Sequence, residues 1–218
     1  MSDQHSVIIF GGTGHSGKYI LKRAVAEGHQ VTAFVRTPSK VPEKIKKNIQ
    51  IVQGDVLNSE QVGNAIKDHD VVLSALGKGL SLGPTTLMSE GAKNIVSGMK
   101  KHEVKNLVMI CGAGSLPNQT SPWLFRHIGE DHKRVVEILK QENESLRWVT
   151  LHPPLIRGSG IISPNYQIEK DNTGKLYVNA GEIADFMMKY ISDEETVKKY
   201  QNCLLGISAG PSSVCSII

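Results

Sequence analysis

VIIFGGTGHSG, residues 7–17, begins with four apolar residues and ends in a cluster of glycines. The apolar run is typical of a buried β-strand, and a stretch of helical period follows it. The glycines fit two frames, Gly11-x-x-Gly14-x-x-Gly17 and Gly12-x-Gly14-x-x-Gly17. In both frames a strand turns into a helix N-terminus, whose free backbone N–H groups attract an anion. The stretch predicts a dinucleotide-binding loop, with a merely structural turn as the alternative.

The rest of the chain alternates short β-rich apolar runs with longer stretches of helical period. Such alternation predicts right-handed βαβ crossovers and an α/β fold, a doubly wound Rossmann domain with a mostly parallel sheet and helices on both faces. The expected strands are residues 7–10, 31–35, 49–53, 71–76, 107–110 and 148–151, and the expected helices are residues 16–27, 59–67, 84–101, 131–141 and 182–191.

The length of 218 residues suits one well-buried domain. We therefore expect residues 1–218 to form a single NAD(P)-binding domain. After about residue 155 the strand–helix rhythm gives way to loops rich in Gly, Pro and Asn, with a hairpin expected around KDNTGK, residues 170–175. Residues 153–218 are expected to form a pocket wall or lid and a C-terminal tail within the same domain.

Composition narrows the class of protein. The net charge is only +4, and the lysines are scattered without interleaved aromatic residues, which argues against a nucleic-acid partner. No apolar run reaches the roughly 18 residues of a membrane span, and the polar start MSDQHS is unlike a signal peptide, so we expect a cytoplasmic protein. The three cysteines form no C-x-x-C pair, so we expect no disulfide and no metal. We also expect a monomer.

Arg36, in FVRTPSK, follows the second expected strand. An NAD site would place Asp or Glu there, about 20 residues after the glycines. An arginine with Ser39 and Lys40 nearby instead favours a 2′-phosphate, and so NADP, over a merely solvated side chain. Asp55, in QGDV, ends the third expected strand, where it either accepts a hydrogen bond from the adenine amino group or caps a turn.

Several of these stretches resemble one group of atypical short-chain dehydrogenase/reductases, the NADPH-dependent flavin reductases, also called biliverdin-IXβ reductases. The most specific is LGPTTLMSEGAKNIVSGMKKHEVKNLV, residues 82–108, supported by FGGTGHSG, VRTPSKVP, VQGDVLN, WVTLHPPLI and GEIADFMM. The resemblance covers most of residues 5–192. It implies an NADPH-binding domain that reduces flavins, and linear tetrapyrroles as further substrates, at the carboxyl end of the sheet.

Position by position, the resemblance also implies a set of cofactor contacts in the glycine loop, at the following strand ends and on the fourth helix. These are Gly11, Thr13, Gly14, His15, Ser16, Gly17, Arg36, Ser39, Lys40, Asp55, Val56, Leu76, Gly77, Lys78 and Met88. The family uses the first of the two glycine frames.

Two positions depart from the family where its chemistry would be. The family has a hydroxyl-bearing residue at Gly112 and a histidine at Leu155. Two histidines are the remaining candidates for catalysis: His132, which matches a family histidine in EDHK, and His152, which ends the sixth expected strand. For His152 the alternative is a histidine satisfied by backbone hydrogen bonds.

A flavin needs less acid catalysis than a carbonyl, because its ring spreads the negative charge and solvent can supply protons. A group of apolar residues could wall such a flat ring: Leu116, Trp123, Phe125, Pro153, Pro154 and Leu155. For Trp123 and Phe125 the alternative is that they pack the loop onto the domain. We expect an NADPH-dependent reductase of free flavins. The alternatives are a non-catalytic NADP-binding sensor or scaffold of the NmrA-like kind, or a reductase of another quinone or carbonyl compound.

The last four residues, Cys215 to Ile218, fit a C-a-a-X prenylation box. The final isoleucine is not a usual last residue, and an unmodified tail that packs on the domain or on another chain is the alternative. One lipid chain seldom anchors a protein stably, so prenylation at Cys215 would give reversible membrane binding and no stable anchor.

Overall fold

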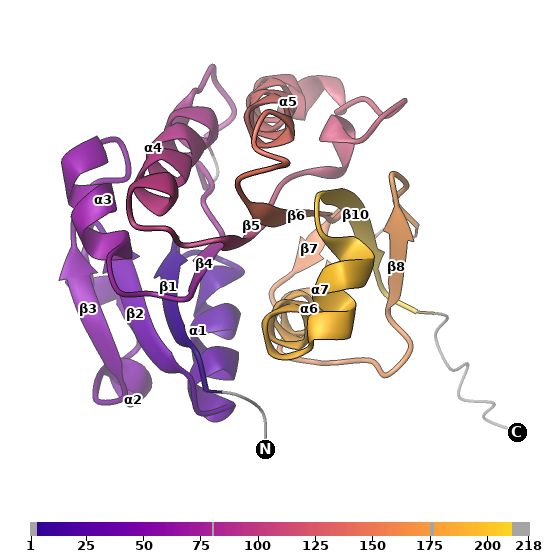
Figure 1. Cartoon of the computed structure of the whole chain (residues 1–218). Helices are drawn as coiled ribbons and strands as arrows, with labels where there is room; N and C mark the ends of the chain where they lie inside the picture. Colours follow the sequence, from indigo (N-terminus) through magenta and orange to yellow (C-terminus); the bar gives the residue numbers. More distant parts are fainter. Residues whose placement is uncertain (1–3, 80, 175–176, 211–218) are drawn as a thin grey trace, which may run out of the picture.

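The computed structural model describes residues 4–79, 81–174 and 177–210. Within these residues an eight-stranded sheet has the strand order β3-β2-β1-β4-β5-β6-β10-β8 (Figure 1). Neighbouring strands are parallel, except that β8 runs antiparallel to β10. The strands are β1 Ser6–Phe10, β2 Gln30–Val35, β3 Ile49–Gln53, β4 Val71–Ser74, β5 Asn106–Ile110, β6 Arg147–His152, β8 Gln167–Lys170 and β10 Cys203–Ser208.

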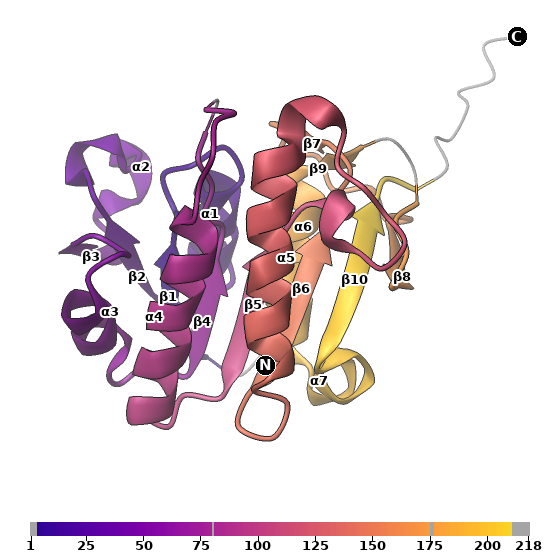
Figure 2. The ribbon, with the colours of Figure 1, turned by 90° about the horizontal axis from the view of Figure 1, so that it is seen from above.

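Helices cover both faces of the sheet. In Figure 1, α1, α6 and α7 lie on one face, and α3, α4 and α5 lie on the other. Figure 2 shows α4 and α5 crossing in front of the parallel strands. The helices are α1 Gly17–Ala26, α2 Glu43–Lys46, α3 Ser59–Ile66, α4 Leu87–Lys101, α5 Arg126–Lys140, α6 Ala180–Ser192 and α7 Glu194–Tyr200.

Each face has its own apolar core, and β1 contributes to both. Ile9 packs with Leu21 of α1, whereas its neighbour Ile8 packs with Ile95 of α4 on the opposite face. Successive strand residues point to opposite faces, so a strand buried on both sides must be apolar throughout. This explains why residues 7–10 form an unbroken apolar run.

The topology reverses at β1, which lies between β2 and β4. The chain moves outward from β1 to β3, then crosses back to β4 on the other side. In doubly wound sheets a crevice forms at the carboxyl ends of the strands where the order reverses, and ligands bind there. The glycine loop follows β1 and therefore lies at this crevice.

The predicted fold class is confirmed. Each expected strand and helix is present, with some shifted ends: α4 begins at Leu87 and α5 already begins at Arg126. A short 3₁₀ helix, η3 Trp123–Phe125, leads directly into α5, so helical structure starts before the apolar period does.

The predicted hairpin around residues 170–175 is wrong, because β8 pairs with the distant β10. Neither β10 nor α7 was expected from the sequence. β10 contains Gly206, where a Cβ would lie 1.7 Å from the carbonyl oxygen of Asn172. That glycine weakens the strand pattern, although the crossing loop requires it.

A second small sheet follows β6. It consists of two parallel strands, β7 Ile156–Arg157 and β9 Val178–Asn179. Ile156 and Val178 pair across it and join the core on the α1 side. This sheet connects the carboxyl end of β6 to α6.

None of the helices in the described ranges combines the length and the apolar character that crossing a membrane requires. In the same ranges, no three His, Cys, Asp or Glu side chains gather as metal ligands. Cys215 lies outside the described residues, so its prenylation stays a prediction.

Candidate functional site

The three glycines of the first frame form one tight unit after β1. Gly11 has a φ of +74°, and a Cβ there would lie 2.4 Å from the carbonyl oxygen of Ala75. A Cβ on Gly17 would lie 2.1 Å from the carbonyl oxygen of Gly11, and Gly14 N–H donates to that same oxygen at 2.9 Å. Bare backbone is therefore required at this turn, and it leads directly into the N-terminus of α1.

A cleft opens beside this loop at the carboxyl ends of β1, β2 and β4. Glycines, apolar residues and two cations line it: Phe10, Gly11, Thr13, Gly14, Phe34, Val35, Arg36, Thr37, Lys40, Gly54, Val56, Ala75, Leu76, Gly77 and Leu87. Backbone N–H groups next to a helix start suit a diphosphate, and the lining includes no carboxylate that would oppose an anion. The residues present fit a dinucleotide.

Arg36 is exposed at the end of β2 and lines the cleft together with Lys40. Ser39 is also exposed, in the short 3₁₀ helix η1 Pro38–Lys40. Asp55 lines an adjoining hollow with Arg36, and its Oδ1 accepts a hydrogen bond from the backbone N–H of Leu57 at 3.0 Å. The turn-capping alternative for Asp55 therefore has a structural basis, while its other oxygen remains available for a ligand.

Two of the expected cofactor contacts, Met88 and Lys78, make contacts within the protein in place of lining the cleft. Met88 is only 2% exposed and packs in the core, and its neighbour Leu87 lines the cleft instead. Lys78 donates to the carbonyl oxygens of Gly83 and Pro84 at 2.9 and 2.7 Å, so it braces its own loop.

Three more of the expected contacts, His15, Ser16 and Gly17, lie at the start of α1 next to the lining. Several further lining residues were not expected from the sequence, although they are immediate neighbours of predicted contacts: Phe10, Val35, Thr37, Gly54, Ala75 and Leu87.

His152 is fully buried, and both of its ring nitrogens have partners. Nδ1 lies 3.0 Å from Ser115 Oγ and 3.2 Å from the carbonyl oxygen of Gly112, and Nε2 lies 2.8 Å from Thr150 Oγ1. Burial lowers its pKa to about 4, so the ring is neutral at pH 7. This geometry favours the alternative of a satisfied histidine over a proton donor that faces a substrate.

His132 also lies close to Gly112. It is 9% exposed, and its Nδ1 is buried without a hydrogen-bond partner. A Cβ on Gly112 would lie 3.1 Å from this nitrogen. Burial lowers the pKa of His132 to about 4, although the nearby Asp131 acts in the opposite direction. The catalytic roles of both histidines stay predictions, and at neutral pH neither ring is the charged imidazolium that acts as a general acid.

The stability of the fold is expected to fall as the pH drops from about 6.5 to about 4. In this window the unfolded chain binds protons on both histidines, whose pKa is lowered from 6.5 to about 4 in the folded state. Each histidine then costs up to about 3 kcal/mol of unfolding free energy. Urea unfolding at several pH values measures this, and His132→Phe should make the pH dependence shallower. A constant unfolding free energy from pH 6.5 to 4 would contradict the burial of both rings.

Apolar side chains remain uncovered at the carboxyl edge of the sheet. Trp123 and Phe125, in the loop between β5 and α5, are 75% and 46% exposed, and Leu155, directly after β6, is 61% exposed. The alternative that Trp123 and Phe125 pack their loop onto the domain is thus not supported. Of the other expected wall residues, Leu116 and Pro153 are buried.

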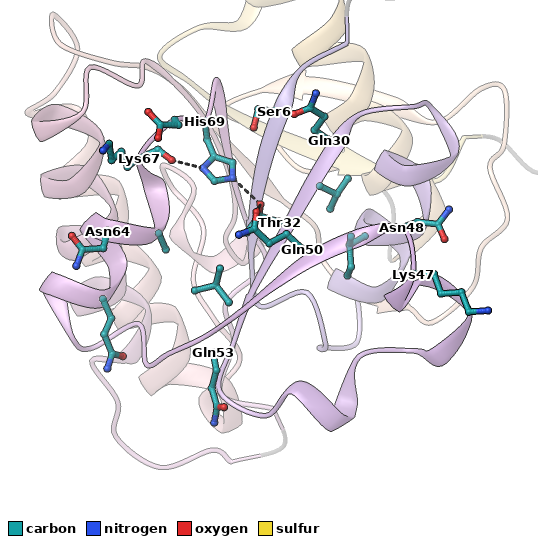
Figure 3. Close-up of a pocket in the computed structure, with 16 residues that line it drawn as sticks. Ser6, Gln30, Thr32, Lys47, Asn48, Gln50, Gln53, Asn64, Lys67 and His69 are labelled. Carbon is teal, nitrogen blue, oxygen red and sulfur yellow. Dashed lines mark hydrogen bonds between the residues drawn. The ribbon is translucent and has the colours of Figure 1, made fainter.

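A larger hollow, of about 940 Å³, lies elsewhere, between the edge strand β3 and α3 (Figure 3). Amide side chains such as Gln50 and Asn64 dominate its lining, and His69 Nε2 lies 2.8 Å from Thr32 Oγ1. It includes no residue of the glycine loop. The glycine loop therefore makes the smaller cleft the candidate cofactor site, despite the difference in volume.

A family model described as NAD(P)H-binding matches residues 11–194. The uncharacterized protein YwnB of Bacillus subtilis is 31% identical over 181 residues, which cover 75% of this chain and 79% of that protein. A phenylcoumaran benzylic ether reductase of Nicotiana tabacum is 35% identical over 85 residues, which cover 35% of this chain and only 28% of the reductase.

Solved structures share the fold. The oxidoreductase ylbE of Lactococcus lactis superposes with a TM-score of 0.79 at 19% identity, over 94% of this chain and 91% of its own. A short-chain dehydrogenase/reductase (wide type) of Veillonella parvula, solved in complex with NADP, gives a TM-score of 0.76 at 12% identity, over 96% of both chains. At these identities the likeness establishes the architecture alone.

Proposed function

The chain belongs to the NAD(P)H-binding family of Rossmann-fold, atypical short-chain dehydrogenase/reductases, and from this premise we propose that it is an NADPH-dependent reductase of free flavins. FMN and riboflavin are the proposed substrates, with biliverdin as a further one. The flavin exchanges like any substrate and is not held as a prosthetic group.

The uncovered apolar side chains at the carboxyl edge carry this proposal. Trp123, Phe125 and Leu155 lie in the two segments that follow β5 and β6, neighbouring strands whose carboxyl ends lie at the same edge of the sheet as the glycine loop. Exposed apolar patches mark binding surfaces, and aromatic faces bind flat ring systems by stacking. A planar, conjugated hydride acceptor fits this surface better than a small polar carbonyl compound does.

The protonation state of the site supports the same choice of acceptor. Bound NADPH supplies a hydride. A positioned acid adds about 10²- to 10⁴-fold where a proton must arrive with that hydride. His132 and His152 are buried and neutral, so neither of these two histidines supplies a charged imidazole for that task. A flavin accepts hydride without such help, and the residues need only hold the rings at the correct distance.

Arg36 is proposed to select NADPH over NADH through the 2′-phosphate. Replacing Arg36 by Ala should weaken NADPH binding by about 10- to 100-fold, the value of a charge-assisted hydrogen bond, while NADH binding hardly changes. Titration of cofactor fluorescence measures both dissociation constants. Arg147→Ala, at the opposite edge of the sheet, is the control and should change neither. Equal losses for both cofactors would contradict the assignment.

The burial of His132 and His152 also favours the second candidate, a non-catalytic NADP-binding sensor or scaffold of the NmrA-like kind. Both candidates require the glycine loop, and only the reductase requires turnover. NADPH oxidation measured side by side with FMN, riboflavin, biliverdins and quinones separates them. Tight NADPH binding without turnover of any acceptor would establish the sensor, and turnover of a quinone alone would move the reductase to another substrate class.

A further inference from the structure

The small β7–β9 sheet presents one outward face. Residue exposure alternates along its first strand: Leu155 and Arg157 are exposed, whereas Ile156 points into the core. Val178 N–H donates to the carbonyl oxygen of Leu155 at 2.9 Å, so Leu155 continues the β7 ladder. Side chains two residues apart on a strand share a face. Arg157 therefore faces the same side as Leu155, the position at which the resembling family has its histidine.

Arg157 is held in place from across this sheet. Its guanidinium carbon lies 3.5 Å from the centroid of the Tyr177 ring, which flanks β9. Arg23, Arg134 and Arg147 pair with carboxylates, whereas Arg157 has no ion pair within the described part of the chain. An arginine stacked on an aromatic ring keeps its N–H edge free to bind an anion in a bidentate manner.

The backbone next to Arg157 rests on the start of α1. The Tyr19 hydroxyl donates to the carbonyl oxygen of Gly158 at 2.6 Å, and a Cβ on Gly158 would lie 2.6 Å from His15 Cε1. These contacts fix the β7 segment against the glycine loop. The residue next to Arg157 is thus packed on the start of α1 and the glycine loop, and Arg157 itself shares a strand face with Leu155.

We propose that Arg157, oriented by Tyr177, recognises an anionic arm on a planar acceptor. The inference rests on the proposed function and deepens it, because it assigns the substrate class: conjugated ring systems with a phosphate or carboxylate side arm. Leu155 contacts the ring, and Arg157 pairs with the arm. Arg157 is a specificity-determining residue that takes no part in the hydride transfer.

FMN and riboflavin test this directly, because they share one ring system and differ by a phosphate. The wild-type chain should show a KM for FMN about 10- to 100-fold below that for riboflavin. Arg157→Met should raise the KM for FMN to the riboflavin value with kcat little changed, and Arg157→Lys should restore part of the preference. Tyr177→Leu should weaken it by freeing the guanidinium. Arg147→Met, at the opposite edge, is the matched control that should leave both KM values unchanged.

A comparison of biliverdin with its dimethyl ester separates the two sources of the anion. If only FMN is preferred over its uncharged counterpart, the site binds phosphate. If biliverdin is also preferred over its ester, the site binds anions in general. Equal wild-type KM values for the two flavins, or parallel losses in Arg157→Met, would overturn the proposal while riboflavin turnover still upheld the reductase. A change in the KM for NADPH alone would also overturn it, because Arg157 would then serve the cofactor. Absence of turnover with every flavin would refute the reductase and, with it, this substrate assignment.

Discussion

Leu155→His is expected to raise biliverdin turnover by about 10²- to 10⁴-fold, the range contributed by a positioned general acid, and to raise FMN turnover far less. The pyrrole nitrogen of biliverdin needs a proton as the hydride arrives, whereas a reduced flavin ring can take its proton from solvent afterwards. Leu155 is 61% exposed just before β7, so a histidine there keeps contact with water and stays protonatable. Leu155→Gln is the control, because it adds polarity of similar size without an acid.

Gly112→Ser extends the same experiment to the other family position. The introduced Cβ would lie 3.1 Å from His132 Nδ1, so the imidazole must move by a few tenths of an ångström. In return, the new hydroxyl would offer a hydrogen bond to a buried nitrogen that has no partner. The double variant should therefore fold and reduce biliverdin faster than Leu155→His alone. Steady-state assays with both acceptors decide: a parallel gain for FMN would show that flavin reduction was limited by proton transfer after all.

The fold could be predicted because its main signals are local. Residues 7–10 are apolar throughout since β1 is covered on both faces, and the glycines follow because the turn into α1 requires bare backbone. β10 carries no such signal. It forms because β6 and β8 supply its neighbours, and Gly206 is required by a loop that crosses from residues 171–174.

The candidate site likewise contains residues that local sequence signals predict and contacts that form only in the folded structure. Arg36 and Lys40 follow a strand end by a fixed spacing, so their place at the cleft was predictable. The contact of His152 with Ser115 was not predictable, because Ser115 lies 37 residues earlier and meets the histidine only after β5 and β6 pair. Local geometry also limits how precisely a sequence pattern can assign a lining residue. Adjacent helix residues point about 100° apart, so at the start of α4 the side chain of Leu87 faces the cleft and that of Met88 the core.

The surroundings of Arg157 could not be predicted from the sequence at all. A short exposed strand after a Pro-Pro pair reads as loop, and the ring that orients the arginine is twenty residues away on β9's flank. Pairing of β7 with β9 brings the two together, and contacts of Gly158 with α1 then fix them beside the cofactor loop. Three elements far apart in sequence must assemble before the anion site exists, and no single segment encodes it.

Gly17→Ala is expected to weaken NADPH binding by about 100-fold or more. The new Cβ would lie 2.1 Å from the carbonyl oxygen of Gly11 and 2.8 Å from Gly12 Cα, and neither backbone atom can yield as a flexible side chain would. The N-terminus of α1 must therefore shift away from the turn, and a misplacement of about 1 Å can cost 10²-fold in positioning. Overpacking should also lower the unfolding free energy by about 1–3 kcal/mol.

Gly63→Ala is the matched control, since it makes the same substitution inside α3, where a Cβ would meet nothing within 4 Å. It should raise the unfolding free energy by about 0.5–1 kcal/mol, because alanine favours helix over glycine, and leave the affinity for NADPH unchanged. Fluorescence titration gives the affinities, and urea unfolding gives the stabilities. If Gly17→Ala is destabilised but binds NADPH as the wild type does, the turn serves the fold alone, and the cofactor must be held elsewhere than at the start of α1.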